Sequence, residues 1–98
     1  MMKYRHDQSP NETITARDPR VAGPGTMLYV DDRAVPVATA FNPHEGWYEH
    51  VVTELRRGAN GVVRQRPVVR NRALVKERVY APYVVRDAAG TVLFRSRP

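Results

Sequence analysis

The sequence predicts an all-β fold: a single small antiparallel meander or open barrel of five to six strands, preceded by an extended N-terminal arm. Short segments rich in β-branched and aromatic residues recur at regular spacing from Thr26 onwards. Gly, Pro, Asn or Asp residues stand between these segments, which is the pattern of strands joined by turns. The length of 98 residues favours one domain.

Residues 1–25 are predicted to form a flexible arm, and residues 26–98 the β-domain. The arm contains Pro10, Pro19 and Pro24 among polar residues, and it shows neither a helical nor a strand period. A segment of this composition cannot bury enough apolar surface to order by itself. It would therefore order only against a partner or another subunit.

The β-domain opens with a predicted hairpin. Residues 27–30 form its first strand, and residues 31–32 are an Asp-Asp pair, which tolerates the positive φ of a tight turn. Residues 35–41 form the return strand, in which Pro36 favours an edge or a strand end. Residues 42–46 then predict a second turn.

The middle of the chain predicts longer strands. Residues 47–55 are rich in aromatic and β-branched side chains; a short helix is the alternative, but no helical apolar stripe is present. The Asn60-Gly61 dipeptide in the following loop is a strong turn signal. Residues 62–80 then predict one long extended stretch, or two strands broken near Pro67.

The last predicted element is a hairpin. Residues 83–86 and 91–96 are its two strands, and both are rich in β-branched or aromatic residues. The loop over residues 87–90 fits a type I turn that closes with Gly90 in the left-handed conformation.

Charge is distributed unevenly along the chain, whose formal net charge is +6. Residues 27–55 carry one Arg against five Asp or Glu, whereas residues 56–86 carry nine Lys or Arg against one Glu. An acidic segment followed by a basic one can indicate a basic binding face. It can equally indicate that the two segments pair across neighbouring strands, where opposite charges attract.

A basic stripe runs through residues 64–78, where most side chains at every second position are cationic. The candidate contact residues on this face are Arg64, Arg66, Arg70, Arg72, Lys76, Arg78 and Tyr80. Side chains on one face of a strand recur at roughly 6.6 to 6.8 Å, similar to the spacing of successive phosphates, so the stripe could follow a nucleic-acid backbone. The same pattern is expected of a strand with one solvent-exposed face, or of a strand whose polar face binds a protein.

The densest polar group is formed by residues 42–50, which include His44, Glu45, Glu49 and His50. Imidazole and carboxylate are suitable zinc ligands, but this spacing matches no known ligand pattern and the chain has no Cys. A turn beside a buried Trp47 is the simpler interpretation. No P-loop, dinucleotide or nucleophile-elbow motif occurs. The sequence therefore predicts no enzyme activity, no metal, no cofactor and no small-molecule substrate.

No membrane partner is expected either. No apolar run approaches the roughly 18 residues that a membrane span needs. The N-terminus lacks the apolar region of a secretory signal. These observations predict a cytoplasmic location in the producing cell.

Two stretches resemble a group of phage proteins: YVDDRAVPVATAFNPHEGWYEHVVT (residues 29–53) and KERVYAPYVV (residues 76–85). The chain resembles small β-rich proteins encoded among the structural genes of tailed bacteriophages and prophages. They share a V-D-G-like hairpin, an E-G-W turn and an E-R-x-Y-G-x-V-like strand, although Asp32 stands where the family favours Gly and Ala81-Pro82 replaces a Gly. The resemblance implies a phage accessory or virion-associated protein, and it transfers no site residues.

The function predicted from these features is that of a non-enzymatic structural or interaction protein. It would bind a protein partner, or a second copy of itself in a homo-oligomer, through sheet edges and the basic stripe. The alternative is a nucleic-acid-binding protein that follows phosphates with the cations of residues 64–78.

Overall fold

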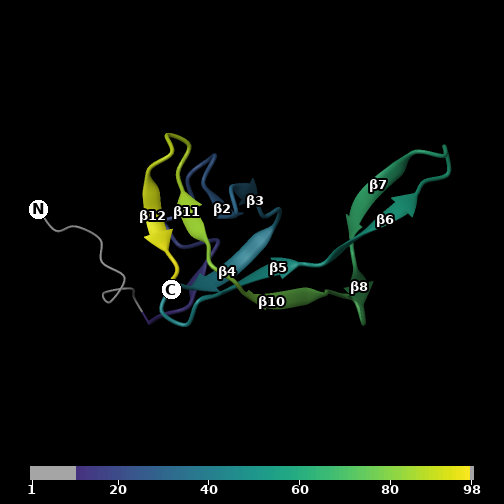
Figure 1. Ribbon diagram of the computed structural model, residues 1–98. Helices are drawn as coiled ribbons and strands as arrows, with labels where there is room; N and C mark the ends of the chain where they lie inside the picture. The colour runs from purple at the N-terminus through teal and green to yellow at the C-terminus, as the bar shows by residue number, and fades with distance from the viewer. Residues whose placement is uncertain (1–10, 98) are drawn as a thin grey trace, which may run out of the picture.

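The computed structural model describes residues 11–97, which contain twelve β-strands and no helix (Figure 1). The all-β prediction is confirmed. The strands form two four-stranded and two two-stranded sheets, all antiparallel. The prediction of one meander or open barrel with five to six strands is therefore wrong, because the strands are shorter and more numerous, and none of the described sheets closes on itself.

Four sheets make up the described chain. The first has the strand order β1 (Ile14–Thr15), β4 (Ala38–Asn42), β5 (Trp47–Val51), β10 (Lys76–Tyr80). The second has the order β12 (Val92–Arg95), β11 (Val84–Arg86), β2 (Met27–Val30), β3 (Arg33–Ala34). The two remaining sheets are hairpins: β6 (Thr53–Arg57) with β7 (Val63–Pro67), and β8 (Val69–Arg70) with β9 (Ala73–Leu74).

The core lies between the two four-stranded sheets, which together form the body. Its buried side chains come from both sheets and their connections: Ile14, Val21, Leu28, Phe41, Tyr48, Tyr83, Val85 and Phe94. The ring of Phe41 meets those of Tyr83 and Phe94 edge-on, with centroids 5.9 and 5.4 Å apart. Such edge-to-face pairs add about 0.5–1.5 kcal/mol each to the burial of the rings.

The segment over residues 11–25 is part of the body, a placement that the lack of a period did not predict. In β1, Ile14 pairs with Phe41 of β4 and is 1% exposed. The Arg20 guanidinium bonds Asp18 and lies 5.5 Å from the ring centroid of Phe94. Its hydrogen bonds hold the pKa of Asp18 at about 2, below the usual 3.8. Residues 1–10 of the predicted arm lie outside the described residues.

The turn predicted at residues 31–32 and the predicted hairpin at the C-terminal end of the β-domain are confirmed, but the return strand of the first hairpin is Arg33–Ala34 and not residues 35–41. Asp31 and Asp32 both have positive φ, 49° and 62°, as a two-residue type I′ turn requires. In the last hairpin Gly90 has φ 87°, and the Asp87 carboxylate accepts the backbone N–H of Thr91. Both turns follow directly from the residues that occupy them.

The central strand boundaries differ from the prediction. The return strand expected over residues 35–41 is wrong, because the chain leaves one sheet at Ala34, is not a strand over residues 35–37, and enters the other sheet at Ala38. Between them Pro36 offers no N–H, and Val37 has φ 53°. Residues 62–80 likewise form four short strands rather than one or two.

Three hydrogen bonds explain the breaks at Val68 and Val75. The N–H of Val52 donates to the C=O of Val75 (2.8 Å), that of Val75 to Val68 (2.9 Å), and that of Val68 to Val52 (2.9 Å). The three valines therefore form a closed ring of donors and acceptors. The ladders β5–β10, β6–β7 and β8–β9 all end on this ring, which we call the valine junction.

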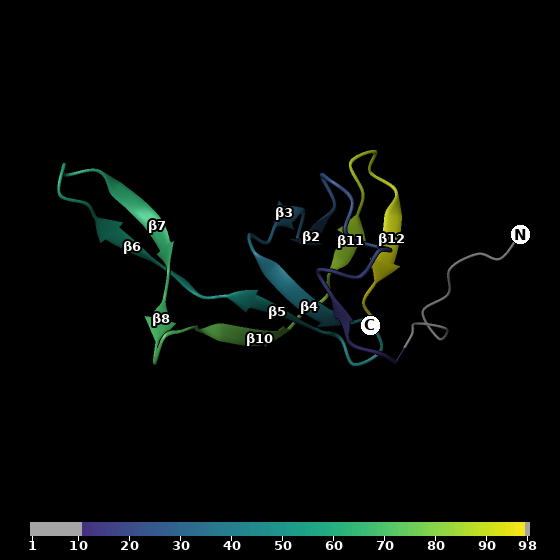
Figure 2. The same ribbon diagram turned by 180° about the vertical axis from the view of Figure 1, so that it is seen from behind.

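Residues 52–75 project from the body beyond the valine junction, and we call them the β-extension. Figures 1 and 2 show β6, β7 and β8 at the far end of the molecule from β11 and β12. The described chain is accordingly elongated, with principal extents of 56 × 29 × 24 Å. The β-extension contributes two-stranded ribbons rather than a further core.

The valine junction predicts that the β-extension can be removed cleanly. Val52 and Val75 already stand opposite each other, so replacing residues 53–74 with Asn-Gly should close β5 and β10 as an ordinary two-residue hairpin. We expect the near-ultraviolet circular dichroism of the body to persist. The thermal midpoint should stay within about 8 °C, the shift that roughly 1 kcal/mol produces in a domain this small. Loss of cooperative unfolding would show that the body depends on the β-extension.

The burial of Ile14 predicts that the segment before residue 25 stabilises the body. Ile14→Ala should lower the free energy of unfolding by about 2–5 kcal/mol, as for other buried large-to-Ala changes. Chemical denaturation would measure this change. The neighbouring Thr13 is exposed, so Thr13→Ala is the control and should have little effect. Equal effects of the two substitutions would contradict the placement of β1 in the core.

Candidate contact surface on the β-extension

The predicted basic stripe is not one continuous track. Its members lie on three strands and a turn: Arg64 and Arg66 on β7, Arg70 on β8, Arg72 in the β8–β9 turn, and Lys76, Arg78 and Tyr80 on β10. The chain reverses at the valine junction and again at the β8–β9 turn. The stripe is therefore divided between the β-extension and the body.

The part of the stripe on the body is engaged with the body itself. The Arg78 guanidinium carbon lies 3.8 Å from the ring centroid of Trp47, which is only 2% exposed. The Lys76 amine lies 4.0 Å from a carboxylate oxygen of Glu49 on the adjacent strand. The interpretation of an internally paired basic face thus fits these two cations, while Tyr80 is 67% exposed beside them.

The part of the stripe on the β-extension has a different environment. The side chains of Arg64, Arg66, Arg70 and Arg72 are exposed and form no hydrogen bond or ion pair within residues 11–97. Residues 52–75 hold six Arg and one Glu, a net charge of +5. Residues 11–51 and 76–97 hold eight Lys or Arg and eight Asp or Glu. The excess positive charge of the described chain therefore lies in the β-extension.

Strand register divides the β-extension into two faces, because directly opposed residues in an antiparallel ladder project to the same side. One face, which we call the cationic face, carries the strand residues that lie an even number of positions from the nearest of Val52, Val68 and Val75 along the chain. Its opposed pairs are Glu54–Arg66, Arg56–Arg64 and Arg70–Ala73. The apolar face carries the pairs Thr53–Pro67, Leu55–Gln65, Arg57–Val63 and Val69–Leu74. The β-extension is thus amphipathic.

The cationic face includes a residue that the sequence prediction missed. Arg56 was expected in a loop, but β6 continues to Arg57 and places Arg56 directly opposite Arg64. Opposed like charges destabilise a ladder. Arg56 is partly neutralised by Glu54, whose carboxylate accepts from its Nε at 2.8 Å. The alternation of Glu54 and Arg56 was the signal in the sequence that could have extended the strand.

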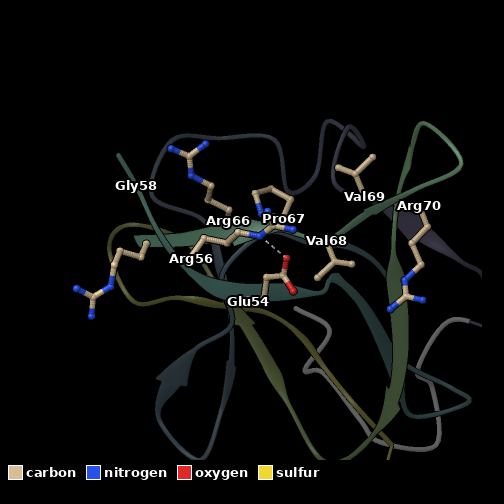
Figure 3. Close-up of a pocket in the computed structure, with 9 residues that line it drawn as sticks. Glu54, Arg56, Gly58, Arg66, Pro67, Val68, Val69 and Arg70 are labelled. Carbon is tan, nitrogen blue, oxygen red and sulfur yellow. Dashed lines mark hydrogen bonds and ion pairs between the residues drawn. The ribbon is translucent and has the colours of Figure 1, made fainter. Parts of the chain in front are cut away.

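A hollow of about 620 Å³ opens where the β6–β7 ribbon adjoins β8, and residues of both faces line it. It is lined by Glu54, Arg56, Arg57, Gly58, Arg66, Pro67, Val68, Val69 and Arg70. Figure 3 shows these side chains and the Arg56–Glu54 ion pair among them. The hollow is a shallow surface feature with four cations and one carboxylate, so it suits an anionic ligand better than a neutral one.

The apolar face is exposed to solvent throughout the described structure. Leu55 is 72% exposed, Val69 59%, Val63 50% and Leu74 48%. Single exposed apolar residues are ordinary, but Leu55 and Val63 share one side of the β6–β7 ribbon, and Val69 and Leu74 share one side of the β8–β9 ribbon. The alternation within residues 64–78 predicted a contact role for the cationic side chains but none for the apolar side chains between them.

The polar group over residues 42–50 does not assemble into a ligand set. Glu49 and His50 are adjacent in β5 and so project to opposite faces of the sheet. Glu45 accepts a hydrogen bond from the Trp47 indole at 3.0 Å. No group of three His, Asp or Glu side chains within residues 11–97 is placed to hold a metal ion.

Comparisons of the chain with protein-family models, with curated proteins and with solved structures found no match. The resemblance to tailed-phage proteins therefore stays a prediction. The part of the chain that the structure describes contains no helix of the length and apolarity needed to cross a membrane.

The β8–β9 turn predicts a measurable strain at Arg72. Asn71 and Arg72 have φ 52° and 64°, and Gly is strongly favoured at the second position of such a turn. Arg72→Gly should therefore stabilise this hairpin by about 1 kcal/mol, the cost of a left-handed non-Gly residue. Slower hydrogen exchange of the β8–β9 amides would measure the gain. Asn71→Ala should have the opposite effect, and faster exchange in both variants would contradict the turn geometry.

Proposed function

We propose that this chain is a non-enzymatic interaction protein whose body carries the β-extension and whose β-extension makes the contact. The observation that supports this most is the exposure of Leu55 and Val63 on one side of the β6–β7 ribbon, and of Val69 and Leu74 on one side of the adjoining β8–β9 ribbon. Contiguous exposed apolar surface is typical of a protein–protein interface. The location on a virion that the resemblance implies is part of the proposal and rests on the residues quoted above.

The construction of the β-extension supports this role. A two-stranded ribbon has little stability of its own in water, since it has no second layer to bury its apolar side chains. Among residues 11–97, the ribbons join the body where β5 and β10 run into the valine junction. Binding a partner to the apolar face would supply the layer that the ribbons lack.

A second copy of the chain fits the apolar face best. An amphipathic ribbon is self-complementary, because two copies related by a two-fold axis place the same patch against itself. Such a contact would bury both apolar faces and leave both cationic faces outside, with the charges of the two cationic faces directed away from each other, while Arg57 at the end of β6 lies on the contact side. The proposed assembly is thus a homodimer joined through the apolar faces of two β-extensions.

The proposal predicts that the apolar face controls self-association. Val63→Ser with Val69→Ser should weaken the dimer at least about tenfold, because burying each valine is worth about 1.5–3 kcal/mol and a two-fold contact loses each one twice. Light scattering over a concentration series would measure this. The matched control is Val37→Ser with Val92→Ser, which removes two exposed valines from the body and should leave the dimer intact.

Two outcomes would overturn the proposal. One is a full-length chain that stays monomeric at the highest concentration measured. The other is a dimer that survives replacement of residues 53–74 with Asn-Gly, because the contact would then lie on the body.

A further inference from the structure

We infer that the cationic face of the β-extension binds double-helical DNA, with the β6–β7 ribbon lying in the major groove. This inference rests on the β-extension being the contact element of the proposed function. It concerns the face opposite to the proposed dimer contact, so that one dimer would present two DNA-binding ribbons.

The first support is charge complementarity. Three arginines of the ribbon project from its cationic face: Arg56 from β6, and Arg64 and Arg66 from β7. Glu54 is the one acidic residue among residues 52–75; it stands opposite Arg66, and its ion pair is with Arg56. Arg56 and Arg64 stand directly opposite each other, and a polyanion would relieve this repulsion and release its own counterions.

The second support is the shape of the β-extension. The B-DNA major groove is about 12 Å wide and admits a two-stranded β-ribbon. The β6–β7 ribbon stands away from the body, as Figures 1 and 2 show, so a duplex could approach it without meeting the four-stranded sheets. Its tip is small, since residues 58–61 are Gly-Ala-Asn-Gly. Cations on both strands of the ribbon can face the two phosphate backbones that border the groove.

The composition of the β-extension favours a duplex over a single strand. Proteins that bind single strands combine cations with aromatic side chains on which bases stack. Residues 52–75 contain no Phe, Tyr or Trp. The exposed Tyr80 lies on β10 of the body. Duplex RNA is disfavoured as well, because its major groove is too deep and narrow for protein side chains to read.

The arginine at the β8–β9 turn agrees with an electrostatic role. Arg72 holds a left-handed conformation in which Gly would be favoured, and its side chain is exposed with no partner in the described part of the chain. Arg70 precedes the same turn on the cationic face and lines the hollow. These two cations would extend the phosphate contacts beyond the ribbon.

The test is a fluorescence-anisotropy titration with a labelled 20-base-pair DNA duplex, one of its single strands, and an RNA duplex of the same sequence, each at several salt concentrations. The full chain should bind the DNA duplex most tightly, with an affinity that falls steeply as salt rises. Arg64→Gln with Arg66→Gln should weaken duplex binding at least about tenfold and reduce the salt slope by about 2. Glu54→Gln should tighten binding, because it removes a repelling carboxylate and frees Arg56.

The matched control is Arg17→Gln with Arg33→Gln, which removes the same charge from exposed sites on the body. It should change the affinity little. Equal weakening by the two double variants would overturn the inference, because net charge alone would then explain binding. Absence of duplex binding at low salt, or tighter binding to the single strand or to RNA, would overturn it as well.

The two proposals fail in different ways. Val63→Ser with Val69→Ser should lose the dimer but keep the contacts of a single ribbon with DNA, whereas Arg64→Gln with Arg66→Gln should keep the dimer. A monomeric chain that binds duplex DNA through the cationic face would overturn the dimer and support this inference. A dimer without affinity for duplex DNA would support the proposed function and overturn this inference. Thermal unfolding of each variant checks that the chain remains folded.

Discussion

The ring of three hydrogen bonds at the valine junction is the constraint on which the shape of the molecule depends. Val52, Val68 and Val75 each donate to one member of the ring and accept from another, so three ladders meet without leaving these backbone groups unpaired. An ordinary hairpin at this position would have closed the body as a two-layer structure. The junction instead leads the chain outward for two further hairpins before β10 returns to its place beside β5.

Local chemistry made the turns predictable and left the connections between them unpredictable. Asp31 and Asp32, and the loop ending at Gly90, adopt the conformations that their residue types favour. The junction has no comparable signature, since Val52, Val68 and Val75 are ordinary strand residues whose partners lie far away in sequence. The two sheets of the body escaped prediction for the same reason: pairing between distant strands is decided by tertiary packing.

The candidate surface was predictable in its residues but not in its division. An alternating pattern places Arg64, Arg66, Arg70, Lys76 and Arg78 in phase, but it does not reveal that the chain reverses twice between them. Those reversals put Lys76 and Arg78 beside Glu49 and Trp47, and leave the others on a ribbon that carries most of the net charge. The pairing interpretation therefore fits Lys76 and Arg78, and binding stays a prediction for the arginines of the β-extension.

The valine junction also bears on how quickly the chain can fold. Bringing β5 and β10 together by closing one long loop would cost chain entropy that grows with loop length. The β6–β7 and β8–β9 hairpins join residues that are close in sequence, and such hairpins form within roughly 1–10 μs. Once they have formed, they take up most of the intervening chain and place Val52 next to Val75. A distant contact thereby becomes a local one, which lowers the effective contact order of the body.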